Sequence, residues 1–518
     1  MARDRQVNEH QFAGVKAAVL GFFLCFFLLI SSGRIGSYDA GQQLSAATLA
    51  ATQHALSTSN PPDPVFWSHA PNGRYYEPHD LGAELLMLPA AWIGAQLDHR
   101  PVDSQFLNPP LPAKVGVSLT YAVVCATGCF FLFLLFAQRY AVSQAFLIVF
   151  TFAAGTYYLA YAKVAWDVAP CAAAMCAFLY YAQRMLLPDA SARTFAAAGF
   201  WLAVVCTFRY SMAPAFVVAL VFLWWRTRAS LRPYLLLASV FVLGMVPMFV
   251  YNAARTGSFW RPANTSAFEL SHGNAMDGNI VHGFLGLIFS SNRGLFFYSP
   301  ILLLGLLLPW IWRGLQARHR HLIEAMSIGT FLYMLVVSKL NHWGAFGWGP
   351  RYLLPCLPIM FLVVGPCLVE VVKKSRLAAS VAITAAVLFN VAPATTNWHV
   401  IIAEYPGAEV MDASTPYALE GIWEGFWRGV NDKPLVFANS NAQFAKSDDG
   451  RRFPDFWTAR LIERSSAGRV AGWLIIAALL GGMAVALRRI VRRASDGGSF
   501  DGLDGIQIQP ERTNGLLS

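Results

Sequence analysis

Long apolar runs are the feature that most restricts how this chain can fold. They recur from GVKAAVLGFFLCFFLLIS at 14–31 to VAGWLIIAALLGGMAVAL at 470–487, each close to the length of about 20 residues that a helix needs to cross a bilayer. Backbone polar groups in lipid must be satisfied within the segment, so continuous runs predict helices and not the alternating strands of a barrel. Only 13% of the residues are charged, roughly half the share in a soluble domain. We therefore predict an all-α polytopic membrane protein.

The formal net charge of +10 is concentrated in short connectors and in the carboxyl-terminal region. The most basic segments are RTRASLR (226–232), RGLQARHRHL (313–322), KKSR (373–376) and LRRIVRR (487–493). Lys and Arg collect in the cytoplasmic connectors of membrane proteins. This distribution favours a cytoplasmic face over a nucleic-acid surface, so we predict no nucleic-acid partner.

Placing these connectors and the amino terminus in the cytoplasm predicts about twelve transmembrane helices, with both chain ends inside. Their expected positions are 14–32, 113–136, 143–163, 168–186, 194–208, 210–226, 233–251, 296–313, 322–338, 352–371, 376–393 and 470–488. Three long loops, about 33–112, 252–295 and 394–469, then lie outside.

The predicted organisation has five parts along the chain. They are a cytoplasmic amino terminus (1–13), a main transmembrane region (14–393), an outer loop or small subdomain (394–469), a last helix (470–488) and a polar, disordered cytoplasmic tail (489–518). The apolar segment at 80–97 is ambiguous. Counting it as a span would invert the next several helices, whereas an interfacial helix keeps every basic connector inside. We favour the interfacial helix.

The first outer loop holds two groups of polar candidates. Asp39, preceded by Tyr38, lies just beyond the first span, and Glu77, His79 and Asp80 precede the amphipathic segment. For Asp39 the alternative is an ordinary helix cap that satisfies exposed amide donors. For the second group the alternative is a solvated part of the membrane interface.

Lys163 and Asp167 lie between two apolar spans in YLAYAKVAWDVAP. A carboxylate at the mouth of a helix pair is costly unless it faces water, a partner or a cavity. A local pair between Lys163 and Asp167 at i,i+4 is the alternative. We favour a functional role for Asp167, because a second acid near Asp39 would form a two-carboxylate site.

Three arginines, Arg209, Arg293 and Arg351, are expected at outer helix ends. Asn292 and Tyr298 accompany Arg293, and His342, Trp343 and Trp348 accompany Arg351 in the turn NHWGAFGWGPRY. Anionic lipid headgroups are one explanation for such arginines. A phosphate or diphosphate site is the sharper one, because the guanidinium fork matches phosphate oxygens. The two tryptophans are expected at headgroup depth.

Four segments resemble, in order, parts of bacterial GT-C superfamily glycosyltransferases. They are YDAGQQLSAATLAA (38–51), NGRYYEPHDLGAELLMLPA (72–90), SSNRGLFFYSPILLL (290–304) and HWGAFGWGPRYLLPCLP (342–358). The likeness is to enzymes that use polyprenyl-phosphate sugars, among them protein O-mannosyltransferases and the aminoarabinose transferase of lipid A. It covers about 14–395 and implies a GT-C-like bundle as the catalytic region.

The resemblance implies a sugar donor on a polyprenyl phosphate and transfer, with inversion, on the periplasmic face of the bacterial inner membrane. Asp39 matches the acidic residue that acts as base or positions the acceptor, and Asp167 matches a second acid. Relatives often have paired acids where this chain has YDA. That departure argues against a metal at this position, and dependence on a divalent metal stays open.

The expected site follows from these assignments. Asp39 and Asp167 are the catalytic candidates, and Arg351, Arg293 and Arg209 are the candidates for the donor phosphate. The candidate substrate-binding residues are Tyr38, Glu77, His79, Asp80, Lys163, Asn292, Tyr298, His342 and Trp348. The acceptor is a lipid, a glycan or a protein, and membrane lipids surround the helices.

Two other functions use similar chains. An O-antigen ligase or polymerase works at the same surface and relies on a large late outer loop, for which 394–469 with His399 is the candidate. A lipid or sugar transporter is expected to have broken helices in corresponding halves and charges near mid-membrane. We favour the glycosyltransferase because the charges gather at helix ends.

Overall fold

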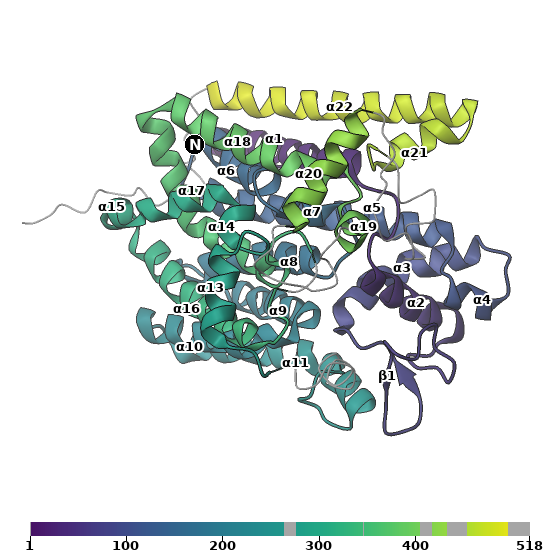
Figure 1. The fold of residues 1–518 in the computed structure, drawn as a ribbon. Helices are drawn as coiled ribbons and strands as arrows, with labels where there is room; N and C mark the ends of the chain where they lie inside the picture. Colours follow the sequence, from purple (N-terminus) through teal and green to yellow (C-terminus); the bar gives the residue numbers. More distant parts are fainter. Residues whose placement is uncertain (1, 264–275, 345–346, 405–416, 432–452, 496–518) are drawn as a thin grey trace, which may run out of the picture.

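The fold is a bundle of helices (Figure 1). The computed structural model describes residues 2–263, 276–344, 347–404, 417–431 and 453–495. Within these ranges, eight helices are long and apolar enough to cross a membrane. This confirms the predicted all-α polytopic class, while the expected number of about twelve spans stays a prediction.

Most predicted spans fall on observed helices. The long apolar ones are α1 (Ala2–Ile30), α5 (Leu111–Ala137), α10 (Ala213–Thr227), α11 (Leu231–Thr256), α16 (Ala317–Lys339), α17 (Leu357–Lys374), α18 (Arg376–Thr395) and α22 (Ser466–Ser495). The 3₁₀ turns η1 (Tyr210–Met212) and η4 (Arg351–Cys356) lead into α10 and α17. Two shorter helices, α8 (Val168–Met185) and α9 (Ala192–Phe208), match the predicted spans at 168–186 and 194–208.

The predicted continuous helix at 143–163 is wrong. The structure has α6 (Val142–Ala154) and a short α7 (Tyr158–Ala162), separated at Gly155. A Cβ atom at Gly155 would lie 2.8 Å from the Thr151 carbonyl oxygen and 3.3 Å from the Cβ of Ala386. The chain therefore turns tightly against a neighbouring helix here, and hydropathy alone does not reveal such a turn.

The predicted continuous helix at 296–313 is also wrong. This stretch consists of α14 (Leu295–Tyr298), η2 (Pro300–Leu307), α15 (Leu308–Ile311) and η3 (Trp312–Gly314). Pro300 and Pro309 cannot donate backbone hydrogen bonds, and proline rings clash with the preceding helical turn. The segment is apolar, but the chain leaves the helical conformation at Ser299, immediately before Pro300.

Small residues let the central helices approach one another. Helix α5 packs against α1, α3 (Leu81–Gln96) and α8, and α9 lies between α8 and α11. A Cβ at Gly128 of α5 would lie 2.6 Å from Ala173 of α8, and one at Gly199 of α9 would lie 2.3 Å from the Leu237 carbonyl oxygen. Such close approaches are typical of helices that associate in membranes. Helix α22 lies beside α1 along one edge of the bundle (Figure 1).

One end of the bundle carries the first long loop, opposite the end that holds the amino terminus (Figure 1). The loop contains α2 (Tyr38–Gln53), α3 (Leu81–Gln96), α4 (Val102–Leu107) and a small antiparallel pair, β1 (Ser68–His69) and β2 (Tyr75–Tyr76). Parts of the other two loops form α13 (Ile280–Phe289), α19 (Trp398–Glu404), α20 (Tyr417–Val430) and α21 (Trp457–Arg464). We call this the loop end of the bundle.

Helix α3 covers the ambiguous segment at 80–97. It has 16 residues, fewer than the roughly 20 that cross a bilayer. It packs against α2 and α5, and Gly94 approaches Ala113 so closely that a Cβ would lie 2.6 Å from the Ala113 backbone nitrogen. These features support the interfacial interpretation, which stays a prediction. The expected domain boundaries are likewise untested.

Candidate active site

Asp39 lies in the first turn of α2 but does not cap the helix. The cap is Ser37, whose side chain accepts a hydrogen bond from the Ala40 backbone N–H at 3.1 Å. The capping interpretation of Asp39 is therefore wrong, because a hydroxyl two residues earlier satisfies the exposed amide. The carboxylate of Asp39 is left to make tertiary contacts.

Those contacts come from three separate parts of the chain. The Asp39 Oδ2 atom accepts hydrogen bonds from the Trp166 indole N–H at 3.1 Å and from the Arg351 guanidinium at 3.2 Å. The His79 Nε2 atom lies 3.8 Å from the same oxygen. Burial acts to raise the pKa of Asp39, but the charges of His79 and Arg351 outweigh it and lower the pKa to about 2. Asp39 is therefore ionised at neutral pH, and 30% of its side chain remains exposed.

His79 is fixed from its other side by Glu77. The buried Glu77 carboxylate accepts a hydrogen bond from the His79 backbone N–H at 2.8 Å. It also contacts the Nδ1 atom of the His79 ring. Arg255, at the end of α11, donates to the backbone carbonyls of both residues. Burial acts to lower the pKa of His79, but the Glu77 and Asp39 carboxylates raise it to about 9. A protonated imidazole therefore faces Asp39.

Asp167 forms a second ion pair beside the first. Its Oδ2 atom lies 3.0 Å from the Arg209 Nε atom, and its Oδ1 atom accepts a hydrogen bond from Arg209 Nη2 at 3.1 Å. Arg209 ends α9, as expected from its position between two short apolar helices. The ring of Tyr352 lies 5.1 Å from the Arg209 guanidinium and 5.3 Å from that of Arg351. The two arginine–carboxylate pairs are thus neighbours.

Aromatic rings hold Arg351 in place. Its guanidinium lies 4.3 Å from the Trp166 ring centroid, a cation–π arrangement. Trp166 also contacts the rings of Tyr161, Trp398 and His399. This packing fixes both the arginine and the indole N–H that reach Asp39.

Asp80 closes the site on the side of α3. It occupies the N-cap position of that helix, and its Oδ2 atom accepts a hydrogen bond from the Tyr210 backbone N–H at 3.0 Å. Burial raises the pKa of Asp80 to about 6. An apolar cavity of about 400 Å³ lies between α3, α5, α8 and α9. Its lining includes Gly82, two residues after Asp80, and Phe208, the residue before Arg209.

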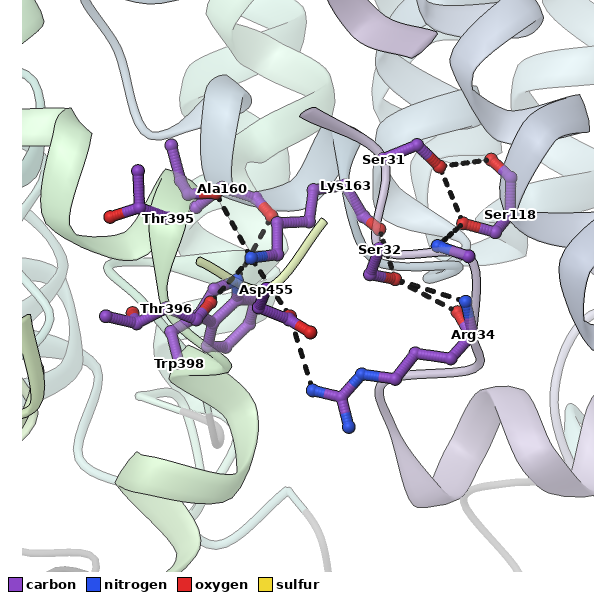
Figure 2. Close-up of polar contacts among 12 residues, drawn as sticks. Ser31, Ser32, Arg34, Ser118, Ala160, Lys163, Thr395, Thr396, Trp398 and Asp455 are labelled. Atoms are coloured by element: carbon purple, nitrogen blue, oxygen red, sulfur yellow. Dashed lines mark hydrogen bonds and ion pairs between the residues drawn. The ribbon is translucent and has the colours of Figure 1, made fainter. Parts of the chain in front are cut away.

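Lys163 belongs to a different cluster (Figure 2). Its ammonium lies 3.0 Å from Asp455 Oδ2 and donates to the carbonyls of Ala394 at 3.1 Å and Thr396 at 2.6 Å. The alternative of a local pair with Asp167 is therefore wrong, because Lys163 pairs with Asp455 and Asp167 pairs with Arg209. Helix α7 ends at Ala162 and α8 begins at Val168, so residues 163–167 are not helical and the i,i+4 geometry is missing.

Asp455 is the centre of this buried cluster. In addition to Lys163, it contacts Arg34 at 3.2 Å and Arg460 at 2.7 Å. Burial acts to raise the pKa of Asp455, but Arg34 and Lys163 lower it to about 2. The segment that follows is fixed to the end of α1, where Trp457 donates to the Leu28 and Ser31 carbonyls. We call Asp455 and its three cations the Asp455 cluster.

The remaining candidates make other contacts within the described part of the chain. Buried Arg293 donates to the Gly347 carbonyl, and the Tyr298 ring lies 4.7 Å from the ring of Trp348. Tyr38 donates to Asp63 at 2.5 Å. The centroids of the His342 and Tyr352 rings lie 6.2 Å apart. Asn292, which precedes Arg293 in the chain, is buried.

The two tryptophans expected at headgroup depth do not face lipid, and their depth in the membrane stays a prediction. Trp348 is fully buried, and Trp343 is nearly so. A Cβ at Gly286 would overlap the Trp343 ring, which shows how closely α13 covers that indole. Both side chains therefore pack inside the protein and do not face lipid.

Several site residues were not singled out from the sequence. Trp166 directly precedes Asp167, and Tyr352 directly follows Arg351. Their position beside a predicted charged site residue could have indicated that they belong to the site. Arg255 and Asp455 gave no such signal, because each acts on a residue far away in the sequence. His399 was considered only for the ligase alternative, yet its ring lies 5.1 Å from that of Trp166.

No group of three or more His, Cys, Asp or Glu side chains with metal-binding geometry occurs among the residues that the structure describes. Dependence on a divalent metal stays open.

The sequence matches no known protein-family model. No curated protein matches it either. The fold is similar to the crystal structure of ArnT from Cupriavidus metallidurans bound to undecaprenyl phosphate, with a TM-score of 0.48 and 14% identity over 94% of this chain and 78% of that one. The structure of the same protein in the apo state gives a TM-score of 0.43 and 16% identity over 81% and 76%.

Proposed function

We propose that the protein is a membrane glycosyltransferase of the GT-C type that moves a sugar from a polyprenyl-phosphate donor to an acceptor hydroxyl. The observation that carries the proposal is the placement of Asp39 beside Arg351, with the Asp167–Arg209 pair next to them. An ionised carboxylate and two arginines at a helix end supply a base and an anion site together. We place this site at the periplasmic face of the inner membrane, because the basic connectors lie toward the other end.

The arrangement fits the chemistry of such a donor. The anomeric carbon already carries a phosphate leaving group, so the enzyme must stabilise departing phosphate and activate a hydroxyl. Arg351 and Arg209 supply preorganised positive charge for the phosphate. Asp39 accepts the proton of the acceptor hydroxyl as that oxygen attacks the anomeric carbon.

A single displacement of this kind inverts the anomeric centre. The new bond joins the acceptor oxygen to the sugar, the bond between the sugar and the phosphate oxygen breaks, and the polyprenyl phosphate leaves. NMR of the product determines the configuration. A retained configuration would exclude the one-step mechanism.

The apolar cavity between α3, α5, α8 and α9 supports a lipid-linked donor. It is lined almost entirely by apolar side chains and reaches Phe208, the residue before Arg209. A prenyl chain in this cavity would bring its phosphate to the arginine pair. A water-soluble nucleotide sugar would gain nothing from such a surface.

The direct test incubates the purified protein in lipid nanodiscs with radiolabelled polyprenyl-phosphate sugars and candidate lipid, glycan and protein acceptors. Asp39→Asn should reduce transfer by about 10²–10⁴-fold, the usual contribution of a general base. Asp103→Asn, at an exposed acid of α4 in the same loop, is the matched control and should transfer normally. Equal transfer by wild type and Asp39→Asn would remove Asp39 from the mechanism.

A further inference from the structure

His79 presents its two ring nitrogens to two different carboxylates. Nδ1 contacts Glu77, and Nε2 lies 3.8 Å from Asp39 Oδ2. The His79 backbone is held as well, because its N–H donates to Glu77 and its carbonyl accepts from Arg255. The ring therefore has little freedom to turn away from Asp39.

A buried network holds Glu77 in position. Glu84 of α3 forms a side-chain hydrogen bond with Glu77, and burial followed by the Glu77 charge raises the pKa of Glu84 well above its ordinary value. Glu84 therefore carries the shared proton. Glu84 also accepts a hydrogen bond from the Tyr251 hydroxyl at 2.9 Å, and Arg255 stacks 4.0 Å from the Tyr251 ring. The Glu77 carboxylate is left free to hold His79.

Arg351, the other cation at Asp39, has a second role in the proposed reaction. A donor phosphate would compete with Asp39 for the same guanidinium, and a phosphate accepts strong charge-assisted hydrogen bonds from arginine. His79 is not open to the same competition, because Glu77 and Arg255 fix it through contacts that point away from Asp39. His79 thus remains beside Asp39 when the donor engages Arg351.

We propose that His79, fixed by Glu77, is a positioning residue that orients the Asp39 carboxylate and keeps it ionised while Arg351 binds the donor phosphate. The role rests on the proposed glycosyltransferase function. It differs from the substrate-binding role expected from the sequence, because His79 acts on the base and not on the sugar.

The charged groups with the main effects on this pair lie on several segments of the chain. Glu77, Asp39 and Asp167 face His79. His79, Arg351 and His399 face Asp39. His399 is neutral at ordinary pH, since burial and then Arg351 and Arg34 lower its pKa to about 3 against the opposing effect of Asp39. His79 and Arg351 are therefore the two groups that supply positive charge to Asp39.

The test measures kcat between about pH 3 and 10 for wild type, His79→Gln and His79→Lys. An opposite charge at this distance shifts a carboxyl pKa by about 1–3 units, so the loss of activity on the acid side should begin about 1–3 pH units higher in His79→Gln than in wild type. His79→Lys retains the charge and should follow wild type. His69→Gln, at an exposed histidine of β1, is the matched control.

A purely structural role for His79 would lower kcat of His79→Gln by the same factor at every pH. Such parallel pH profiles for wild type and His79→Gln would overturn the proposal. Glu77→Gln provides a second readout. Removing the Glu77 charge should move the loss of activity at alkaline pH from about 9 toward the ordinary histidine range. An unmoved alkaline limb would contradict the role of Glu77.

A measurement without substrate separates this proposal from the proposed function. Infrared titration of the purified protein follows the carboxyl C=O band that Asp39→Asn removes. This band should titrate at a higher pH in His79→Gln than in wild type. If wild type transfers no sugar but the band moves, the glycosyltransferase proposal fails while the coupling stands. If the band does not move, the positioning role fails whatever the activity.

Discussion

Asp39 and Asp167 each face an arginine, and each arginine also lies beside the ring of Tyr352. The site therefore holds its positive charge ready before any phosphate arrives. Such preorganisation is effective because no charge needs to be moved into place during the reaction. The same pairs keep both carboxylates from standing uncompensated beside apolar helices.

Arg351→Ala should weaken donor use more than folding. Hydrogen bonds to charged groups contribute about 1.5–3 kcal/mol, so the KM for the donor should rise by roughly 10–150-fold. Steady-state kinetics against donor concentration measures this, with Arg74→Ala at an exposed loop arginine as the control. A variant that folds and transfers normally would reduce Arg351 to an interfacial anchor.

The His79 contacts should make stability depend on pH in a definite direction. The pKa of His79 is raised to about 9 in the folded protein from about 6.5 in an unfolded chain. Its stabilising contribution is therefore fully present below about pH 6.5 and is lost as the pH rises through about 9. The difference in unfolding midpoint between wild type and His79→Gln should shrink across that window. A difference that stays constant with pH would contradict the raised pKa.

Helix α3 carries Asp80 and Glu84 on a segment that lies close against α5. The contact depends on Gly94, because its Cα sits where any side chain would meet the Ala113 backbone. This close approach packs α3, in the first outer loop, against the membrane helix α5. The geometry of the site therefore depends on packing between these two helices.

Gly94→Val should destabilise the protein by about 1–3 kcal/mol, the usual cost of overpacking. Thermal unfolding in one detergent measures the effect. Gly481→Val is the matched control, because a Cβ at Gly481 of α22 would meet nothing within 4 Å. Equal midpoints for the two variants would show that α3 can move away from α5.

The Asp455 cluster connects segments that are far apart along the chain. Arg34 follows α1, Lys163 joins α7 to α8, and the Lys163 ammonium also holds the carbonyls at the end of α18 (Figure 2). These same segments lead to Asp39, Asp167 and His399. One buried carboxylate thus fixes the relative positions of the chain segments around the site.

Asp455→Asn should weaken the whole bundle. Removing one partner of a buried ion pair costs about 3–5 kcal/mol, because the remaining charges are left uncompensated. We expect a lower unfolding midpoint and faster proteolysis of the third loop. Glu324→Gln, which breaks an exposed pair with Arg226, should cost about 0–1 kcal/mol. A stable, protease-resistant Asp455→Asn variant would show that the cluster is not needed to hold the loop.

The sequence by itself determined the all-α membrane class, the positions of most helices and the loops that carry the polar candidates. These properties are local, since the length of an apolar run decides whether a helix crosses a bilayer. The breaks within 143–163 and 296–313 were missed. A hydropathy pattern records composition, whereas Gly155 and the two prolines act through backbone geometry.

Only the tertiary structure decided which charges meet. Arg351 and Asp39 are 312 positions apart, and both were predicted for the site, but their direct contact was not. Lys163 was a candidate for substrate binding, with a local pair to Asp167 as the alternative, and it instead pairs with Asp455. The physical reason is that an ion pair depends on where packed helices place two side chains, and this follows from close contacts such as those at Gly94 and Gly128. The residue types indicate the chemistry, and the packing selects the partners.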